Sequence, residues 1–238
     1  MNEKLTFSIV IPAFNEEKNL TACIESAQTQ KGNFALEVIV VDNNSSDNTS
    51  QVAQDLGARV IFEKQQGVGA ARRTGVTAAL GEYVVNLDAD SHLPEDYLLN
   101  VLERFQKNSK LVCLGGQFYF YDGVPWQNFF RPMVFYILLF FARVVSLGKI
   151  GPTGNNMVFK KSDYEKTRGF NPELRYGEDA AMSRELSRLG EVKLDMRLKV
   201  YTSARRFKLD FKLFVYFLNF LRMCFVGKPV KNELHPAG

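Results

Sequence analysis

Short apolar runs alternate with helix-like segments through residues 7–90, and this alternation restricts the fold more than any other feature. The runs are Phe7–Pro12, Glu37–Asp42, Arg59–Phe62 and Val84–Leu87. Runs of this length are typical of buried strands in a parallel sheet. The segments between them place apolar residues at helical spacing. Connections between parallel strands are right-handed, so the sequence predicts an α/β fold with a doubly wound, mostly parallel central sheet and helices on both faces.

Two carboxylates, Asp88 and Asp90, directly follow the last of these runs. Open α/β sheets bind ligands at the carboxyl ends of their strands. Like charges this close repel each other, and Mg²⁺ or Mn²⁺ relieves the repulsion because it prefers oxygen ligands and often bridges to phosphates. The alternative is a solvated acidic turn. Pro94 is expected near the first position of the next helix.

The second half of the chain predicts a less regular arrangement. We expect a strand from Leu111 to Tyr121, a helix from Glu178 to Leu189 and a strand from Glu191 to Val200. The last run alternates strictly between apolar and polar residues, which is typical of a half-exposed strand and favours antiparallel pairing.

Two apolar segments, residues 129–147 and 208–226, have no clear place in this sheet. Their longest uninterrupted apolar run, Met133–Ala142, is too short to span a bilayer. Three interpretations stay open for them: a helix packed on the core, an amphipathic helix lying on a membrane surface, or a homodimer interface.

Charge and cysteine content exclude several classes of protein. The net charge is only +4, so no nucleic-acid partner is expected. The cysteines, Cys23, Cys113 and Cys224, fit no zinc pattern and indicate a reducing compartment. Met1–Lys4 leads straight into a strand, so no signal peptide is predicted. We therefore expect a cytoplasmic protein, with peripheral contact to the cytoplasmic membrane face as an open alternative.

Acidic and amide side chains recur where predicted strands end or helices begin. They are Asn15-Glu16, Asp42, Asp88 with Asp90, and Glu178-Asp179. We expect them to converge on one edge of the sheet, where Asp42 can accept a hydrogen bond from a nucleobase or ribose. Arg72 and Arg73 can reach phosphates from the helix after Gly69, although either arginine alone also fits a solvated surface charge.

The same stretches resemble, in order and spacing, the motif series of family 2 glycosyltransferases with the GT-A fold. They are Val10–Glu16, Val40–Asp47, Gly69–Arg73, Asp88–Asp90 and Gly177–Asp179. Each motif is weak alone, but the ordered set is specific and covers about residues 5–205. The resemblance implies a metal-dependent, inverting, hexosyltransferase-type enzyme. It would move one sugar from a nucleoside-diphosphate sugar, expected to be a UDP-sugar, to a hydroxyl acceptor.

The resemblance also implies roles for individual residues. The nucleotide-sugar contacts fall on Pro12, Ala13, Asn15, Glu16, Asp42, Arg72, Asp88, Ala89 and Asp90. Asp90 would bind Mg²⁺ or Mn²⁺ on the diphosphate, and Asp88 would contact the ribose or the metal. Asp179, beside Glu178, resembles the general base that takes the proton of the acceptor hydroxyl.

Two departures from the family pattern affect these assignments. Arg73 and Thr74 replace the residues that the family often has there, so donor contacts at these positions are open. Residues 203–207 lack the Gln and Trp of processive synthases, so a polymer-extruding synthase is not expected. Arg205 and Arg206 remain candidates for binding diphosphate or acceptor, with surface charge as the alternative. His92 is expected to be a loop residue.

Other functions fit parts of the pattern. Gly67-Val68-Gly69 resembles the start of a dinucleotide-binding turn, as in an NAD(P)-dependent oxidoreductase, but Arg72 replaces the third glycine. A sugar-nucleotide nucleotidyltransferase should have a glycine-rich loop where this chain has Ala13–Glu17. A non-catalytic scaffold would not require both Asp90 and Asp179.

The predicted organisation is a GT-A domain followed by a helical extension. Residues 1–207 form the domain, with 1–90 binding the nucleotide and 91–207 the acceptor. Residues 208–238 form an amphipathic helix and tail. The apolar segments favour a lipid-linked acceptor or a cell-envelope glycan, and equally permit a dimer.

Overall fold

The computed structural model describes residues 6–124, 126, 128–129, 144, 151–174 and 177–205, and within them the chain forms one mixed sheet. The sheet has the order β3-β2-β1-β4-β7-β6-β8-β5. Its parallel half comprises β1 (Phe7–Ala13), β2 (Leu36–Asp42), β3 (Arg59–Phe62) and β4 (Tyr83–Asn86). The other half comprises β5 (Ser91–His92), β6 (Leu111–Phe120), β7 (Met157–Lys160) and β8 (Glu191–Thr202). The predicted α/β fold with a mostly parallel sheet is confirmed.

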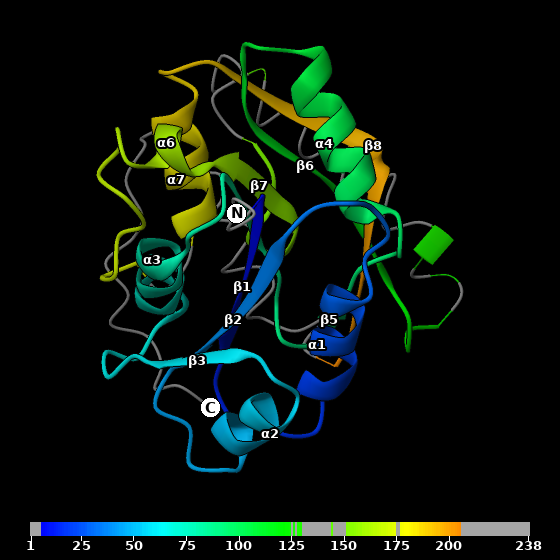
Figure 1. Cartoon of the computed structure of the whole chain (residues 1–238), viewed down its shortest axis with the longest axis vertical. Helices are drawn as coiled ribbons and strands as arrows, with labels where there is room; N and C mark the ends of the chain where they lie inside the picture. Colours follow the sequence, from blue (N-terminus) through cyan, green and yellow to red (C-terminus); the bar gives the residue numbers. More distant parts are fainter. Residues whose placement is uncertain are drawn as a thin grey trace.

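Helices cover both faces of this sheet (Figure 1). One face carries α1 (Leu20–Gln28), α2 (Thr49–Asp55) and α4 (Tyr97–Lys107). The other carries α3 (Val68–Ala78), α6 (Lys161–Tyr164) and α7 (Glu178–Leu186), and the short 3-10 turn η1 (Gly154–Asn156) directly precedes β7. The strand order runs outward from β1 to β3 and then returns to β4 beside β1, so right-handed connections place α3 opposite α1 and α2.

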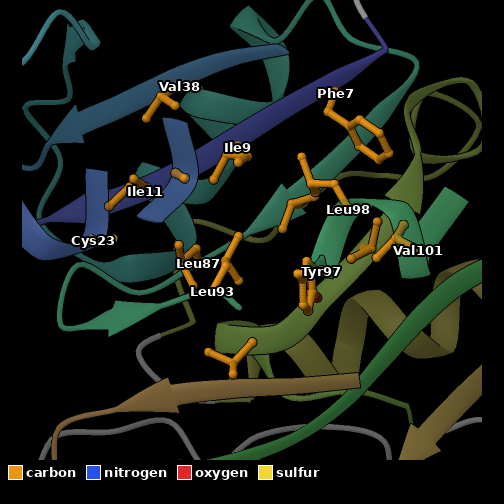
Figure 2. Close-up of a cluster of buried hydrophobic side chains, with 14 of the residues drawn as sticks. Phe7, Ile9, Ile11, Cys23, Val38, Leu87, Leu93, Tyr97, Leu98 and Val101 are labelled. Carbon is orange, nitrogen blue, oxygen red and sulfur yellow. The ribbon is translucent and has the colours of Figure 1, made fainter. Parts of the chain in front are cut away.

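Alternate residues of the central strands build two separate apolar cores. In β1, Phe7, Ile9 and Ile11 face α1 and α4 (Figure 2). Val10 points to the other face, toward α3. All four side chains are fully buried. Because β1 is apolar on both faces, it lies at the middle of the molecule, and its carboxyl end is held rigidly for the residues that follow.

The structure corrects two details of the predicted elements. The helix after Pro94 begins only at Tyr97, and the Pro94 carbonyl accepts the Tyr97 N–H in a preceding turn. The strand predicted as antiparallel, β8, is parallel to β6 and antiparallel only to the short β5. The alternating pattern of β8 correctly indicated a half-exposed strand, but it could not show whether the neighbouring strands run parallel or antiparallel to β8.

Several expectations fall outside the described residues. They include the C-terminal extension, nearly all of segment 129–147, and Arg206. Among the helices that the structure describes, none is both long and apolar enough to cross a membrane.

Candidate active site

The carboxyl ends of β1, β2 and β4 meet at one edge of the sheet. Ala13 pairs with Asp42 across β1 and β2, and Val10 pairs with Asn86 across β1 and β4. The strand order reverses between β1 and β4, and open α/β sheets bind ligands beside such a reversal. Pro12, Ala13, Asp42 and the stretch after Asn86 therefore lie where the sequence predicted convergence.

Asp42 shapes the loop that follows β2. Its Oδ1 accepts the Ser45 N–H at 2.9 Å, and its Oδ2 accepts the Ser50 hydroxyl. The same loop contacts Asn15, whose Oδ1 accepts the Ser46 N–H at 2.8 Å and whose backbone has a left-handed φ of 54°. Carboxylate oxygens accept more than one hydrogen bond, so Asp42 keeps acceptor capacity while it fixes the walls of the site.

Asn43 connects this loop to the start of α3, a role that the sequence did not reveal. Its Nδ2 donates to the carbonyls of Glu63 and Gln65 at 3.0 and 2.7 Å, and its Oδ1 accepts the Gly67 N–H at 2.7 Å. An Asn directly after a buried strand was the only signal in the sequence. The contact sets where α3 begins and hence where its arginine lies.

Arg72 joins two predicted motifs that are far apart in the sequence. Its Nη2 donates to Oδ1 of Asp88 at 2.8 Å, and its Nη1 donates to Oε1 of Glu178. The guanidinium is buried, so a solvated surface charge is the wrong interpretation for this residue. Burial raises the pKa of Glu178 to about 7, although the charge of Arg72 opposes that shift. This cluster fixes the start of α7 against the end of β4.

Asp179 lies next to that cluster in the first turn of α7. Its Oδ2 accepts the Gly154 N–H at 2.9 Å, and its Oδ1 accepts the Ala180 N–H at 2.7 Å. Gly154 also packs against the Arg72 guanidinium so closely that an added Cβ would lie 2.1 Å from Nη1. The side chain of Asp179 is half-buried, so it is held in one orientation and remains accessible.

Arg205 makes a second bridge, between Asp90 and Glu16. Its Nε donates to Oδ2 of Asp90 at 3.0 Å, and its Nη2 donates to both carboxylate oxygens of Glu16, at 2.6 Å to Oε2. Both carboxylates are buried. The structure therefore brings Arg205 beside the predicted metal ligand, where it is partly exposed and paired with two carboxylates.

The turn that presents Arg205 is itself tightly bound. Asp122, which follows β6, accepts the Ser203 hydroxyl and the Ala204 N–H. The Ser203 N–H donates to the Asp90 carbonyl at 3.1 Å, and the Thr202 hydroxyl donates to Oδ1 of Asp90 at 3.3 Å. Asp122 and Thr202 were missed because their contacts depend on the pairing of β8 with β5 and β6.

Several polar groups near the site have less direct roles. Burial, helped by the charges of Asp88 and Asp90, raises the pKa of the Cys23 thiol, so this side chain is no nucleophile at neutral pH. His92 lies in β5 and stacks on Tyr201, with ring centroids 5.3 Å apart, so its prediction as a loop residue was wrong. Arg73 is exposed, unlike its neighbour Arg72.

The acidic groups at this edge suit a cation that a ligand also helps to hold. Within the residues that the structure describes, no cluster of three or more His, Cys, Asp and Glu side chains is arranged to bind a metal ion. Asp88 and Asp90 supply two carboxylates on one short stretch, and Asp90 already faces a positive charge. Mg²⁺ typically takes one or two protein carboxylates together with substrate phosphates. The donor set fits such a shared site.

Comparison with known sequences places most of the chain in one family. Residues 8–168 match the family described as Glycosyl transferase family 2. The Escherichia coli chondroitin synthase is 37% identical over 112 residues, which is 45% of this chain and 16% of that protein. The chain thus spans well under half the length of this curated relative.

Solved structures agree on the fold. The mannosyltransferase PcManGT from Pyrobaculum calidifontis, in complex with GDP-Man and Mn²⁺, superposes with a TM-score of 0.72 at 18% identity. The match covers 95% of this chain and 64% of that one. Glucosyl-3-phosphoglycerate synthase from Mycobacterium tuberculosis, in complex with Mn²⁺, UDP and phosphoglyceric acid, gives 0.69 at 21% identity over 94% of this chain and 80% of that one. The family match covers more than half of the sequence, and the chain belongs to glycosyl transferase family 2, with the GT-A fold.

Proposed function

We propose that this chain transfers one sugar from a nucleoside-diphosphate sugar to a hydroxyl acceptor, with inversion at the anomeric carbon. The main support for this proposal is a pair of ion bridges at the sheet edge. Arg72 links Asp88 to Glu178, and Arg205 links Asp90 to Glu16. The bridges support one shared site, because they link residues expected to bind the donor to Glu178, the neighbour of the residue expected to act as base. The relatives described above in complex with GDP-Man or UDP support a nucleotide-sugar donor.

Donor binding is assigned to the end of β1 and the loop after β2. Pro12, Ala13 and Asn15 would line the nucleoside side, and Asp42 would accept a hydrogen bond from the ribose or base. We expect a UDP-sugar, as the family resemblance implied, and the ligands named with the structural relatives include UDP as well as GDP-Man. Ala89 is small and buried, so we expect the backbone groups beside it to complete the wall of the donor site.

Asp88 and Asp90 would hold Mg²⁺ or Mn²⁺ together with the diphosphate. When bound, that cation supplies positive charge to the departing nucleoside diphosphate. Mn²⁺ is the ion named with both structural relatives. Arg205 would add positive charge on the same side, and Arg206, which lies outside the described residues, stays a candidate for binding diphosphate or acceptor.

Asp179 would act as general base toward the acceptor hydroxyl. The Gly154 N–H fixes one carboxylate oxygen, and the half-buried side chain leaves acceptor capacity for the incoming proton. Glu178 is tied to Arg72, so it positions the helix and does not compete for this role. We propose a lipid-linked or envelope-glycan acceptor as the first class to test, because segments 129–147 and 208–226 are strongly apolar.

Paired variants test this function directly. We expect release of UDP or GDP from a panel of nucleotide sugars with Mn²⁺ to fall about 10²–10⁴-fold in Asp179→Asn, as is typical for the loss of a general base. Nucleotide binding, followed by thermal shift, should survive in Asp179→Asn and weaken in Asp90→Ala. Asp55→Asn, an exposed aspartate on α2, is the matched control. Undiminished turnover in both site variants contradicts the proposal.

A further inference from the structure

The Arg205 guanidinium takes the place expected for a cation at Asp90. It donates to Oδ2 of Asp90 at 3.0 Å and reaches both oxygens of Glu16. Glu16 and Asp90 come from different strand ends and are both buried, so without a positive charge between them they would repel each other. In this structure the arginine supplies that charge, and a divalent cation at Asp90 would have to approach the same oxygen.

The geometry shows that this contact is built into the fold. Asp122 accepts hydrogen bonds from Ser203 and Ala204, and Ser203 donates to the backbone of Asp90. The arginine is therefore presented by a short turn fastened to β6 and to the Asp90 stretch. Its guanidinium side chain nevertheless remains 35% exposed, so it can exchange partners without unfolding the turn.

A nucleoside diphosphate would change the balance at this point. Arginine binds phosphate with paired, charge-assisted hydrogen bonds as well as it binds carboxylate. A bare divalent cation beside Arg205 would meet a positive charge, whereas a cation that arrives with a diphosphate brings an alternative partner for the arginine. Metal and nucleotide should therefore bind much better together than separately.

We propose that Arg205 holds the cation place at Asp90 and Glu16 while no donor is bound and moves to the donor diphosphate when metal and nucleotide bind together. This inference rests on the proposed function for its nucleotide step, while the exclusion of a bare cation depends on Arg205 alone. Arg205 is then the residue that couples the two binding events, and the coupling is reciprocal because it is a free energy shared by both ligands.

The test measures Mn²⁺ binding by electron paramagnetic resonance, without substrate turnover, in the presence and absence of UDP or GDP. In Arg205→Gln we expect Mn²⁺ alone to bind about tenfold more tightly than in the unmodified chain. We also expect the factor by which nucleotide improves Mn²⁺ binding to shrink by about tenfold. The reciprocal titration of UDP with and without Mn²⁺ should show the same reduction.

Arg197→Gln is the matched control. Arg197 lies on β8, the strand that leads into the Arg205 turn. It pairs with the Asp195 carboxylate at 3.3 Å and with none of the described site residues named above. Its substitution should leave both Mn²⁺ affinities unchanged. Asp122→Asn keeps the arginine and weakens the turn that presents it, so it should shift Mn²⁺ binding in the same direction by a smaller factor. This variant also tests the proposal if Arg205→Gln does not fold.

The outcomes separate this inference from the proposed function. Equal Mn²⁺ affinity in Arg205→Gln and the unmodified chain, with nucleotide coupling intact in both, overturns the inference and leaves the function standing. Failure of the unmodified chain to bind UDP or GDP with Mn²⁺ overturns the function. In that case, tighter binding of Mn²⁺ alone by Arg205→Gln still supports the exclusion of a bare cation. An unchanged affinity for Mn²⁺ alone overturns that exclusion.

Discussion

Two arginines bridge the two aspartates of the Asp88-Ala89-Asp90 stretch to two glutamates, and they differ mainly in burial. Arg72 links Asp88 to Glu178 with a side chain only 4% exposed, whereas Arg205 links Asp90 to Glu16 with a side chain 35% exposed. Similar ion pairs have different consequences in these settings. A buried pair is strongly disrupted when one partner is removed, while a partly exposed arginine can exchange its partner.

The two bridges also cross the boundary that was predicted between the two halves of the chain. The nucleotide-binding half was predicted to end at Asp90 and the acceptor-binding half to begin after it. Each bridge joins the two: Arg72 of the first half holds Glu178 of the second, and Arg205 of the second half holds Glu16 of the first. The proposed donor and acceptor sites therefore share the ion pairs that hold their charged residues in place.

The largest expected effect is the loss of Arg72. Arg72→Met keeps much of the side-chain volume but leaves Asp88 and Glu178 without their shared cation. We expect the free energy of unfolding to fall by about 3–5 kcal/mol, as is typical when one partner of a buried pair is removed. Urea denaturation at neutral pH measures the loss.

Arg205→Met is the comparison for that experiment. Its guanidinium is partly solvated, so we expect a smaller loss of about 1.5–3 kcal/mol, the usual range for hydrogen bonds to charged groups. Similar losses in the two variants would show that burial does not separate the bridges. A larger loss of stability in Arg205→Met than in Arg72→Met would mean that the Arg205 bridge contributes more to stability than the Arg72 bridge.

A smaller effect should come from Gly154, which touches the first bridge only. A Cβ at this position would lie 2.1 Å from Nη1 of Arg72, and that guanidinium is held on both sides. We expect Gly154→Ala to lose about 1–3 kcal/mol of stability through overpacking. Turnover should fall as well, because the Gly154 N–H orients Asp179.

The double variant sharpens this prediction. In Arg72→Met the clashing guanidinium is absent, so adding Gly154→Ala should lower stability by less than it does in the unmodified chain. Additive losses would show that the two residues do not clash. Gly57→Ala serves as the control for turnover, since a Cβ there has nothing within 4 Å and only its φ of 74° is strained.

Much of the parallel half could be predicted from the sequence. Strands such as β1 and β2 are apolar on both faces, which only a sheet covered by helices explains, and polar residues mark their carboxyl ends. Strand-end positions therefore identified Asp42, Asp88 and Asp90 before their contacts were known. The confirmed fold and family follow from these short-range signals and their order.

The second half depends on contacts that a local pattern does not contain. The register of β8 against β6 shifts after Gly115, and an added Cβ at Gly116 would lie 1.8 Å from the Leu198 carbonyl. The shift buries Asp195 and exposes Met196, which the alternating pattern had placed the other way. Contacts that depend on such a register shift, including those that hold the Arg205 turn, could not be derived from sequence spacing alone.

The buried Asp195 offers the most selective test, because it belongs to a carboxylate–arginine cluster outside the site. Burial acts to raise its pKa, but hydrogen bonds from Arg197 and Arg104 outweigh burial and hold the pKa of Asp195 well below its ordinary 3.8. A lowered folded pKa stabilises the protein above pH 3.8, and that contribution is lost as the pH falls toward the folded value. Asp195→Asn should therefore lose about 1–3 kcal/mol at pH 7.

The pH dependence distinguishes this ion cluster from simple packing. The difference in unfolding free energy between Asp195→Asn and the unmodified chain should narrow as urea titrations move from pH 7 to below pH 3.8, because the carboxyl is then protonated in the unfolded state while the folded state still holds it ionised. Asp55→Asn, exposed on α2, should show little difference at any pH. A gap for Asp195→Asn that stays constant with pH would mean that shape, and not charge, holds Arg104. Arginine–carboxylate pairing would then be a weaker guide to the two bridges at the active site.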